Sequence, residues 1–151
     1  MRIGPVRPTE TDAVADVYLS AISGMTYLPE LYTEDETREF IRNVLLPNNE
    51  VWVAKDADEL LGFVGFGDGT LRHLWVRTDY QNMGVGTALL NLAKERCPEG
   101  LQLKVFQQNS GARRFYERNG FSLVELTDGS SNEEHEPEAR YVWSQEPEGV
   151  S

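Results

Sequence analysis

The chain has 151 residues, a formal net charge of −11, 40% hydrophobic residues and a single cysteine. Its length predicts one domain over residues 1–151, ending in a loose tail at 145–151. The acidic balance argues against a nucleic-acid partner and is compatible with cationic substrates such as amines. No apolar run approaches the ~20 residues of a membrane span, so no membrane partner is expected. One cysteine and the lack of a signal-peptide pattern favour the cytoplasm.

Two helices are expected in the first third of the chain. Thr9 or Thr11 can cap the first of them. A capping box of Thr33 and Glu36 opens the second helix, which is expected to continue to about Val44. The apolar residues of the first helix recur at helical spacing: Val14, Val17, Tyr18 and Ile22.

The rest of the chain alternates between predicted strands and helices. Two further helices are expected at 86–96 and 110–118, and residues 127–138 are expected to form a polar, acidic loop. The strand at 101–106 is predicted to run parallel to the strand before it, because a helix connects the two. Seven segments in all have the apolar runs or the alternation typical of strands: 2–6, 51–54, 61–66, 70–76, 101–106, 121–126 and 139–143.

The most informative segment is Gln81–Thr87, which lies between a predicted strand and a predicted helix. Gly84 and Gly86 permit positive φ and close approach of a ligand, and the start of the helix leaves backbone N–H groups free. Such a turn predicts a site for a phosphate or pyrophosphate; the alternative is a turn that only begins a helix. Because Leu89 replaces the third glycine of a dinucleotide fingerprint and no Gly-Lys-Ser/Thr follows, a nucleotide-binding module is disfavoured.

A second segment strengthens this interpretation: Asn109-x-x-Ala112-x-x-Phe115-Tyr116-Glu117-x-x-Gly120-Phe121. Together with Gln81-x-x-Gly84-x-Gly86, it resembles the GNAT family of N-acetyltransferases in residues, order and spacing. The resemblance covers most of the chain and implies the GNAT acyl-CoA N-acyltransferase fold. In that α+β fold of three layers, a mixed, mostly antiparallel sheet is flanked by helices. Residues 25–32, 127–134 and 141–143 resemble a bacterial subgroup without an assigned substrate.

The resemblance implies that acetyl-CoA is the co-substrate, lying where the strand that ends at Val76 splays from the strand that ends at Phe106. The backbone N–H of Val76 would polarise the thioester carbonyl. Tyr116 would protonate the departing thiolate, although packing in the core is its alternative role. Asn109 would bind the coenzyme arm, cap the following helix, or do both. The residues expected to bind the cofactor are Leu74, Trp75, Val76, Gln81, Asn82, Met83, Gly84, Val85, Gly86, Thr87, Asn109 and Tyr116.

By the same resemblance, two loops border the acceptor site. Their candidate residues are Tyr27 and Tyr32 in the first loop and Glu133 and Glu134 in the second, where a solvated acidic loop is the alternative. A metal site at this acidic run is rejected, because adjacent carboxylates lack ligand spacing.

A neutral amine must lose a proton when it attacks, so a base is needed. His73 and Asp68 are the candidates on or near the cleft. His73 is also a candidate acceptor residue, and a structural or surface histidine is its alternative. Some family members place a glutamate where this chain has Lys104, so that assignment does not transfer. Cys97 is expected to be a packing residue.

These observations predict an N-acetyltransferase that moves the acetyl group to a primary amine of a small molecule or peptide by direct attack in a ternary complex. The alternative is a protein of the same fold that binds or senses acyl-CoA without catalysis. A homodimer is possible. The identity of the amine is not encoded in any recognisable motif.

Overall fold

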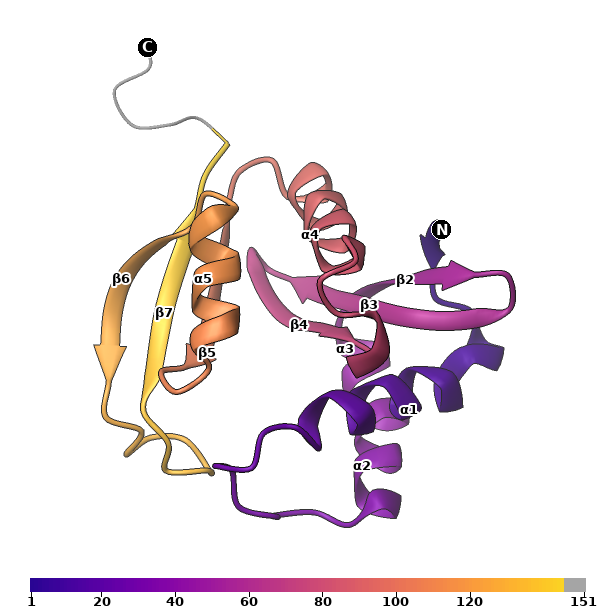
Figure 1. The fold of residues 1–151 in the computed structure, drawn as a ribbon, viewed down its shortest axis with the longest axis horizontal. Coiled ribbons are helices and arrows are strands. Elements are labelled where there is room, and N and C mark those ends of the chain that lie inside the picture. The colour runs from indigo at the N-terminus through magenta and orange to yellow at the C-terminus, as the bar shows by residue number, and fades with distance from the viewer. Residues whose placement is uncertain (146–151) are drawn as a thin grey trace.

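A seven-stranded sheet runs through the computed structural model, which describes residues 1–145 (Figure 1). The strand order is β1-β2-β3-β4-β5-β7-β6, and neighbouring strands are antiparallel except for β4 and β5. The predicted tail at 145–151 lies, apart from Gln145, outside the described residues. The strands are β1 (Arg2–Pro5), β2 (Glu50–Asp56), β3 (Glu59–Gly67), β4 (Thr70–Val76), β5 (Leu101–Phe106), β6 (Ser122–Thr127) and β7 (Glu138–Trp143).

Helices cover both faces of the sheet, and each face has its own hydrophobic core. On one face α1 and α2 pack over a core that includes Val17 and Phe63, while on the other α4 and α5 pack over Leu89 and Tyr141 (Figure 1). This is the mixed, mostly antiparallel α+β arrangement that was predicted. Among residues 1–145, no helix combines the length and apolar character needed to cross a membrane. The helices are α1 (Thr11–Ile22), α2 (Glu34–Phe40), α3 (Leu46–Asn48), α4 (Val85–Arg96) and α5 (Ser110–Arg118).

The start of the first helix differs from the prediction. Neither Thr9 nor Thr11 caps α1, and the Thr11 hydroxyl donates to the Pro8 carbonyl at 3.1 Å instead. Pro8 begins a 3-10 turn whose Glu10 carboxylate accepts from the Arg7 N–H at 2.8 Å. The chain therefore already turns before α1 begins, and the threonines do not occupy the position from which a side chain caps a helix.

The second helix begins as predicted but ends later. The Glu36 N–H donates to Thr33 Oγ1 at 3.1 Å and the Thr33 N–H donates to Glu36 Oε1 at 2.9 Å, which confirms the capping box. The α-helix itself ends at Phe40, but a π-helical turn at Ile41–Leu45 carries the chain into α3. The continuous helical stretch therefore ends at Asn48 and not near Val44, as was predicted.

β4 and β5 are parallel, as predicted, but they pair at only one point within the described chain. Thr70 lies opposite Gln102 near the start of both strands, and the Gln102 N–H donates to the Gly69 carbonyl at 2.9 Å. Beyond that point each strand stays with its other neighbour: β4 pairs with β3 as far as Val76, and β5 pairs with β7 as far as Phe106. The sheet therefore opens between the carboxyl ends of β4 and β5.

Replacing Gly62 with alanine should lower the free energy of unfolding by about 1–3 kcal/mol, the usual cost of overpacking. A Cβ at Gly62 would lie 2.8 Å from the Trp75 carbonyl oxygen and 3.3 Å from Leu89 Cδ1, so β4 and α4 would have to move. Gly65→Ala on the same strand is the control, since its Cβ would meet no atom closer than 3.5 Å. Urea unfolding measures both variants, and an equal loss of stability in the two would contradict the prediction.

Candidate active site

A cleft of about 610 Å³ lies where β4 and β5 diverge. The end of β4 and the start of α4 form one wall, and α5 forms the other; Figure 1 shows where these elements lie. Ala21 and Met25, at and just beyond the end of α1, add a third side. A concave site of this volume is large enough for a cofactor or a small-molecule ligand.

The residues predicted to bind the cofactor line this cleft, except for Met83 and Val85. Met83 is 66% exposed, whereas Val85 is buried in the core under α4. The structure therefore brings together two segments that are about twenty residues apart in sequence, on opposite walls of one cavity. The predicted cofactor residues that line the cleft are Leu74, Trp75, Val76, Gln81, Asn82, Gly84, Gly86, Thr87, Asn109 and Tyr116.

The cleft also contains residues to which sequence analysis gave no role in ligand binding. On α5 they follow a helical repeat from Gly111 through Arg114 and Phe115 to Arg118, so they form one stripe that faces the cavity. The repeat is visible in the sequence, but only the packing of the helix shows which stripe turns inward. The full set is Ala21, Met25, Gly111, Ala112, Arg114, Phe115 and Arg118.

The loop before α4 has the backbone conformation expected of an anion site. Gly84 is the N-cap of α4 with φ of 84°, and Asn82 also has a positive φ, of 67°. No described side chain caps this helix, so the N–H groups of its first turn lack a side-chain acceptor. These N–H groups and the helix dipole favour a phosphate. A Cβ at Gly86 would be in ordinary van der Waals contact with the Phe115 ring of α5, at 3.5 Å.

The backbone at the end of β4 turns toward the cleft. The Arg77 N–H donates to the Leu61 carbonyl at 2.8 Å, and Val76 lies opposite Gly62 in the register of β3 and β4. Because amides alternate in direction along an antiparallel pair, the N–H of Val76 points away from β3. With β5 diverging on that side, this amide faces the cavity that Val76 lines.

α5 brings Asn109 and Tyr116 to the cleft. The Ala112 N–H donates to Asn109 Oδ1 at 3.1 Å, which confirms the predicted cap. The Tyr116 ring packs edge-on between Phe115 and Phe121, with centroids 5.2 and 5.4 Å away. The Tyr116 hydroxyl is protonated at neutral pH, as tyrosine ordinarily is, and burial raises its pKa further. Within residues 1–145 no group is hydrogen-bonded to that hydroxyl, which leaves its proton available.

Four of the predicted acceptor residues lie on two loops that meet at the bottom of Figure 1, one between α1 and α2 and one between β6 and β7. The Tyr32 hydroxyl donates to the Glu133 carboxylate, and the Tyr27 ring packs edge-on to Phe106 at 6.1 Å. The Tyr27 hydroxyl is buried without a partner among the described residues. Burial, helped by the charge of Glu134, raises the pKa of Tyr18 on α1.

His73 lies in a half-buried aromatic cluster and not on the cleft wall. Trp75 Nε1 donates to His73 Nδ1 at 3.2 Å, and the rings of Tyr18 and Phe40 each lie 6.3 Å from the imidazole. Burial, helped by the charge of Arg72, lowers the pKa of His73 to about 4, so the ring is neutral at pH 7. Its contact with the cleft is indirect, because the Trp75 that it holds lines the cavity.

The other candidate base, Asp68, lies in the turn between β3 and β4. Its φ is 53°, its side chain is 97% exposed, and one carboxylate oxygen is 3.8 Å from Arg72. Among the described residues that line the cleft, none is Asp, Glu or His. Among residues 1–145, no three His, Cys, Asp or Glu side chains are grouped so that they could hold a metal ion.

Sequence comparison identifies the class of protein to which this cavity belongs. The sequence profile of the acetyltransferase (GNAT) family matches residues 18–121, and the chain belongs to this family. It is 30% identical over 119 residues to the peptidyl-lysine N-acetyltransferase YiaC of Escherichia coli, covering 78% of this chain and 80% of that protein. It is 34% identical over 114 residues to the peptidyl-lysine N-acetyltransferase YjaB of the same organism, covering 75% of this chain and 69% of that protein.

Solved structures agree in fold. The solution structure of apo YjaB from Escherichia coli has a TM-score of 0.77 at 23% identity and covers 95% of this chain and 98% of its own. The structure of yncA from Salmonella typhimurium, with its cofactor acetyl-CoA, has a TM-score of 0.76 at 16% identity and covers 100% of this chain and 97% of its own. The protein is therefore a GNAT-fold acetyltransferase that uses acetyl-CoA.

Gly84→Ala should weaken the binding of acetyl-CoA about tenfold or more, because its Cβ would project from the loop into the space that a phosphate needs. Gly69→Ala is the matched control. Both glycines have positive φ, 84° and 71°, and a Cβ at either would meet no atom within 4 Å. Each variant therefore carries about 1–2 kcal/mol of backbone strain, but only Gly84 lies at the cleft. Calorimetric titration measures the affinity, and similar dissociation constants for the two variants would overturn the assignment of this loop.

The low pKa of His73 predicts that stability depends on pH. The folded imidazole takes up a proton only near pH 4, whereas the ordinary value is 6.5, so the unfolded chain binds more protons between these values. His73 therefore stabilises the fold fully above pH 6.5, and this contribution, on the order of 3 kcal/mol, is lost as the pH falls toward 4.

His73→Gln should remove this part of the pH dependence, while carboxylates that titrate in the same range are common to both chains. Urea unfolding at pH 7 and pH 4.5 for the variant and the wild type gives the difference. If both chains lost the same stability between the two pH values, the burial of a neutral imidazole would not be the cause.

Proposed function

We propose that the protein transfers the acetyl group of acetyl-CoA to a primary amine by direct attack within a ternary complex. The acceptor is a lysine side chain of a peptide or a small-molecule amine. One observation carries the proposal: the phosphate-type loop at Gly84, the amide of Val76 and the hydroxyl-bearing Tyr116 all line one cavity. The names of the relatives, which are peptidyl-lysine N-acetyltransferases, support the lysine side chain.

The cofactor wall supplies backbone donors. The N–H groups at the start of α4, beyond Gly84, would hold the pyrophosphate, and the exposed edge of β4 would hold the amide-containing arm. We assign to the Val76 N–H the thioester carbonyl, since a donor in that place stabilises the negative charge that develops on the oxygen during attack.

We assign to Tyr116 the role of general acid. When the carbon–sulfur bond breaks, the leaving thiolate needs a proton, and the Tyr116 hydroxyl can supply it. Two features support this role: the hydroxyl belongs to a cleft-lining residue, and no described residue competes for its proton. The rings of Phe115 and Phe121 fix its orientation.

The acceptor amine must be neutral when it attacks, although a lysine-type amine has a pKa of ~10.4. Since no Asp, Glu or His is among the described residues of the cleft wall, we propose that water carries the proton out of the cavity. Glu133 and Glu134, in the loop beside it, would attract the ammonium form of the acceptor and receive that proton. Tyr27 and Tyr32 would form the aromatic side of the entrance.

A sensor that binds acyl-CoA without turnover is the second candidate. The observation in its favour is the same lack of a carboxylate or imidazole among the described residues of the cleft wall. The unbonded hydroxyl of Tyr116 favours catalysis.

We also propose that the chain forms one domain over residues 1–151 and acts in the cytoplasm. The continuous sheet through residues 1–145 supports the first statement, and the single Cys97 supports the second. Burial raises the pKa of the Cys97 thiol, which fits a packing role. The homodimer stays a prediction, to be measured by light scattering.

Tyr116→Phe should lower kcat about 100-fold or more while leaving the dissociation constant of acetyl-CoA nearly unchanged, because the aromatic packing is kept and only the proton donor is lost. Tyr80→Phe is the control, since that hydroxyl donates to Glu59 and does not belong to the cleft. Release of free thiol from acetyl-CoA is followed with lysine peptides and small amines, and mass spectrometry identifies the product.

Two results would contradict these assignments separately. An unchanged kcat in Tyr116→Phe would remove Tyr116 from the mechanism but not the transferase activity. Tight binding of acetyl-CoA by the wild type, without transfer to any amine, would favour the sensor.

A further inference from the structure

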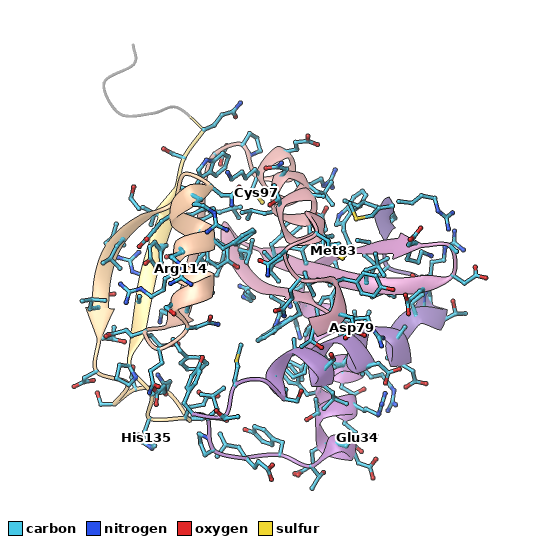
Figure 2. The ribbon with its side chains drawn as sticks, in the orientation of Figure 1. Glu34, Asp79, Met83, Cys97, Arg114 and His135 are labelled. Atoms are coloured by element: carbon cyan, nitrogen blue, oxygen red, sulfur yellow. The ribbon has the colours of Figure 1, made fainter. Side chains whose placement is uncertain are left out.

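Arg114 and Arg118 are two cations that the fold holds at the cleft without a partner. They lie four residues apart on α5, so their side chains share one face of the helix, and both line the cavity. Figure 2 shows Arg114 on this helix. Both residues are exposed, and no residue within 1–145 forms an ion pair or hydrogen bond with either guanidinium.

The neighbouring charged residues of α5, Arg113 and Glu117, already have hydrogen-bond partners. Arg113 Nε donates to the Tyr141 hydroxyl at 3.1 Å, and that hydroxyl donates to Glu117 at 2.6 Å, so this second pair turns toward β7. The chain has 25 acidic and 14 basic residues, yet no Asp or Glu is among the described residues that line this cavity. Two neighbouring arginines without an acidic partner at such a cavity indicate an anionic ligand.

The position of the pair selects one phosphate of the co-substrate. The pyrophosphate has its own donors in the N–H groups beyond Gly84, on the opposite wall. Tyr116, by contrast, is 6% exposed, so the thioester end lies in the interior and the nucleotide end lies toward solvent, where Arg114 and Arg118 are. A terminal phosphate monoester carries about −1.5 to −2 charges at pH 7 and matches the forked donors of arginine.

We propose that Arg114 and Arg118 bind the 3′-phosphate of coenzyme A and make the enzyme discriminate against 3′-dephospho-CoA. This inference rests on the acetyl-CoA site of the proposed function and adds to it a residue pair that selects the ligand. The competing use of the same pair is the pyrophosphate, which 3′-dephospho-CoA retains. The two ligands therefore separate the two uses.

The test is calorimetric titration of CoA and of 3′-dephospho-CoA into the full chain and into Arg114→Gln, Arg118→Gln and the double variant. The wild type should prefer CoA by about tenfold or more, as a charge-assisted bidentate contact implies. Each single variant should lose part of this preference, and the double variant should bind the two ligands equally. Its affinity for 3′-dephospho-CoA should match that of the wild type.

Arg42→Gln is the matched control, because Arg42 is exposed and lies outside the cleft, and its side chain forms no ion pair or hydrogen bond with any other described residue. It removes the same charge and should leave the preference intact. Thermal unfolding of each variant shows that the fold is retained. Raising the salt concentration should reduce the preference of the wild type, since exposed charges are screened.

Two outcomes would overturn the proposal, and they differ in what else they affect. If the wild type bound CoA and 3′-dephospho-CoA equally, or if the double variant weakened both by the same factor, the pair would not bind the 3′-phosphate, and the acetyl-CoA site would stand. If the wild type bound neither ligand, the cofactor site of the proposed function would fail as well.

Discussion

The cleft depends on one interruption of strand pairing, between the carboxyl halves of β4 and β5. The two strands meet where Thr70 lies opposite Gln102 and then separate. The amide edge of β4 near Val76 consequently has no strand beside it, and backbone groups left without a partner are costly when they are removed from water. A ligand that carries amides of its own can satisfy them as an additional strand would. The fold thus presents a strong hydrogen-bonding edge inside the sheet, and the other site residues are arranged around it.

Electrostatic segregation allows an acidic protein to bind a polyanion. The net charge is −11, yet no Asp or Glu is among the described residues of the cleft wall, where the N–H groups beyond Gly84 and the pair Arg114 and Arg118 are the positive features. The carboxylates Glu133 and Glu134 lie instead on the neighbouring loop. The described wall of the cleft is therefore suited to an anion although the chain as a whole is acidic.

The prediction succeeded at several local features of this fold and at the parallel pairing of β4 and β5, whereas the cap of α1 and most features that depend on distant contacts were not predicted. The loop around Gly84 and the cap at Asn109 depend on neighbours in sequence, so motif and spacing predicted them. The burial of His73 depends on Tyr18 and Phe40 from two other elements, and nothing in its own strand signals it. The contact between the two acceptor loops joins residues 101 positions apart. The inward stripe of α5 likewise required knowledge of the packing.

The position of β7 constrains the order in which this protein can be assembled. β7 is the last described strand to leave the ribosome, yet it lies inside the sheet, between β5 and β6. Before it arrives, β5 is attached to the rest of the sheet only where Thr70 meets Gln102, and its other edge is open. At about 5–20 residues per second, synthesis leaves this open edge waiting for seconds, and an unpaired edge is a template for aggregation. Incomplete translation products should therefore be hazards for the cell and not weakly active enzymes.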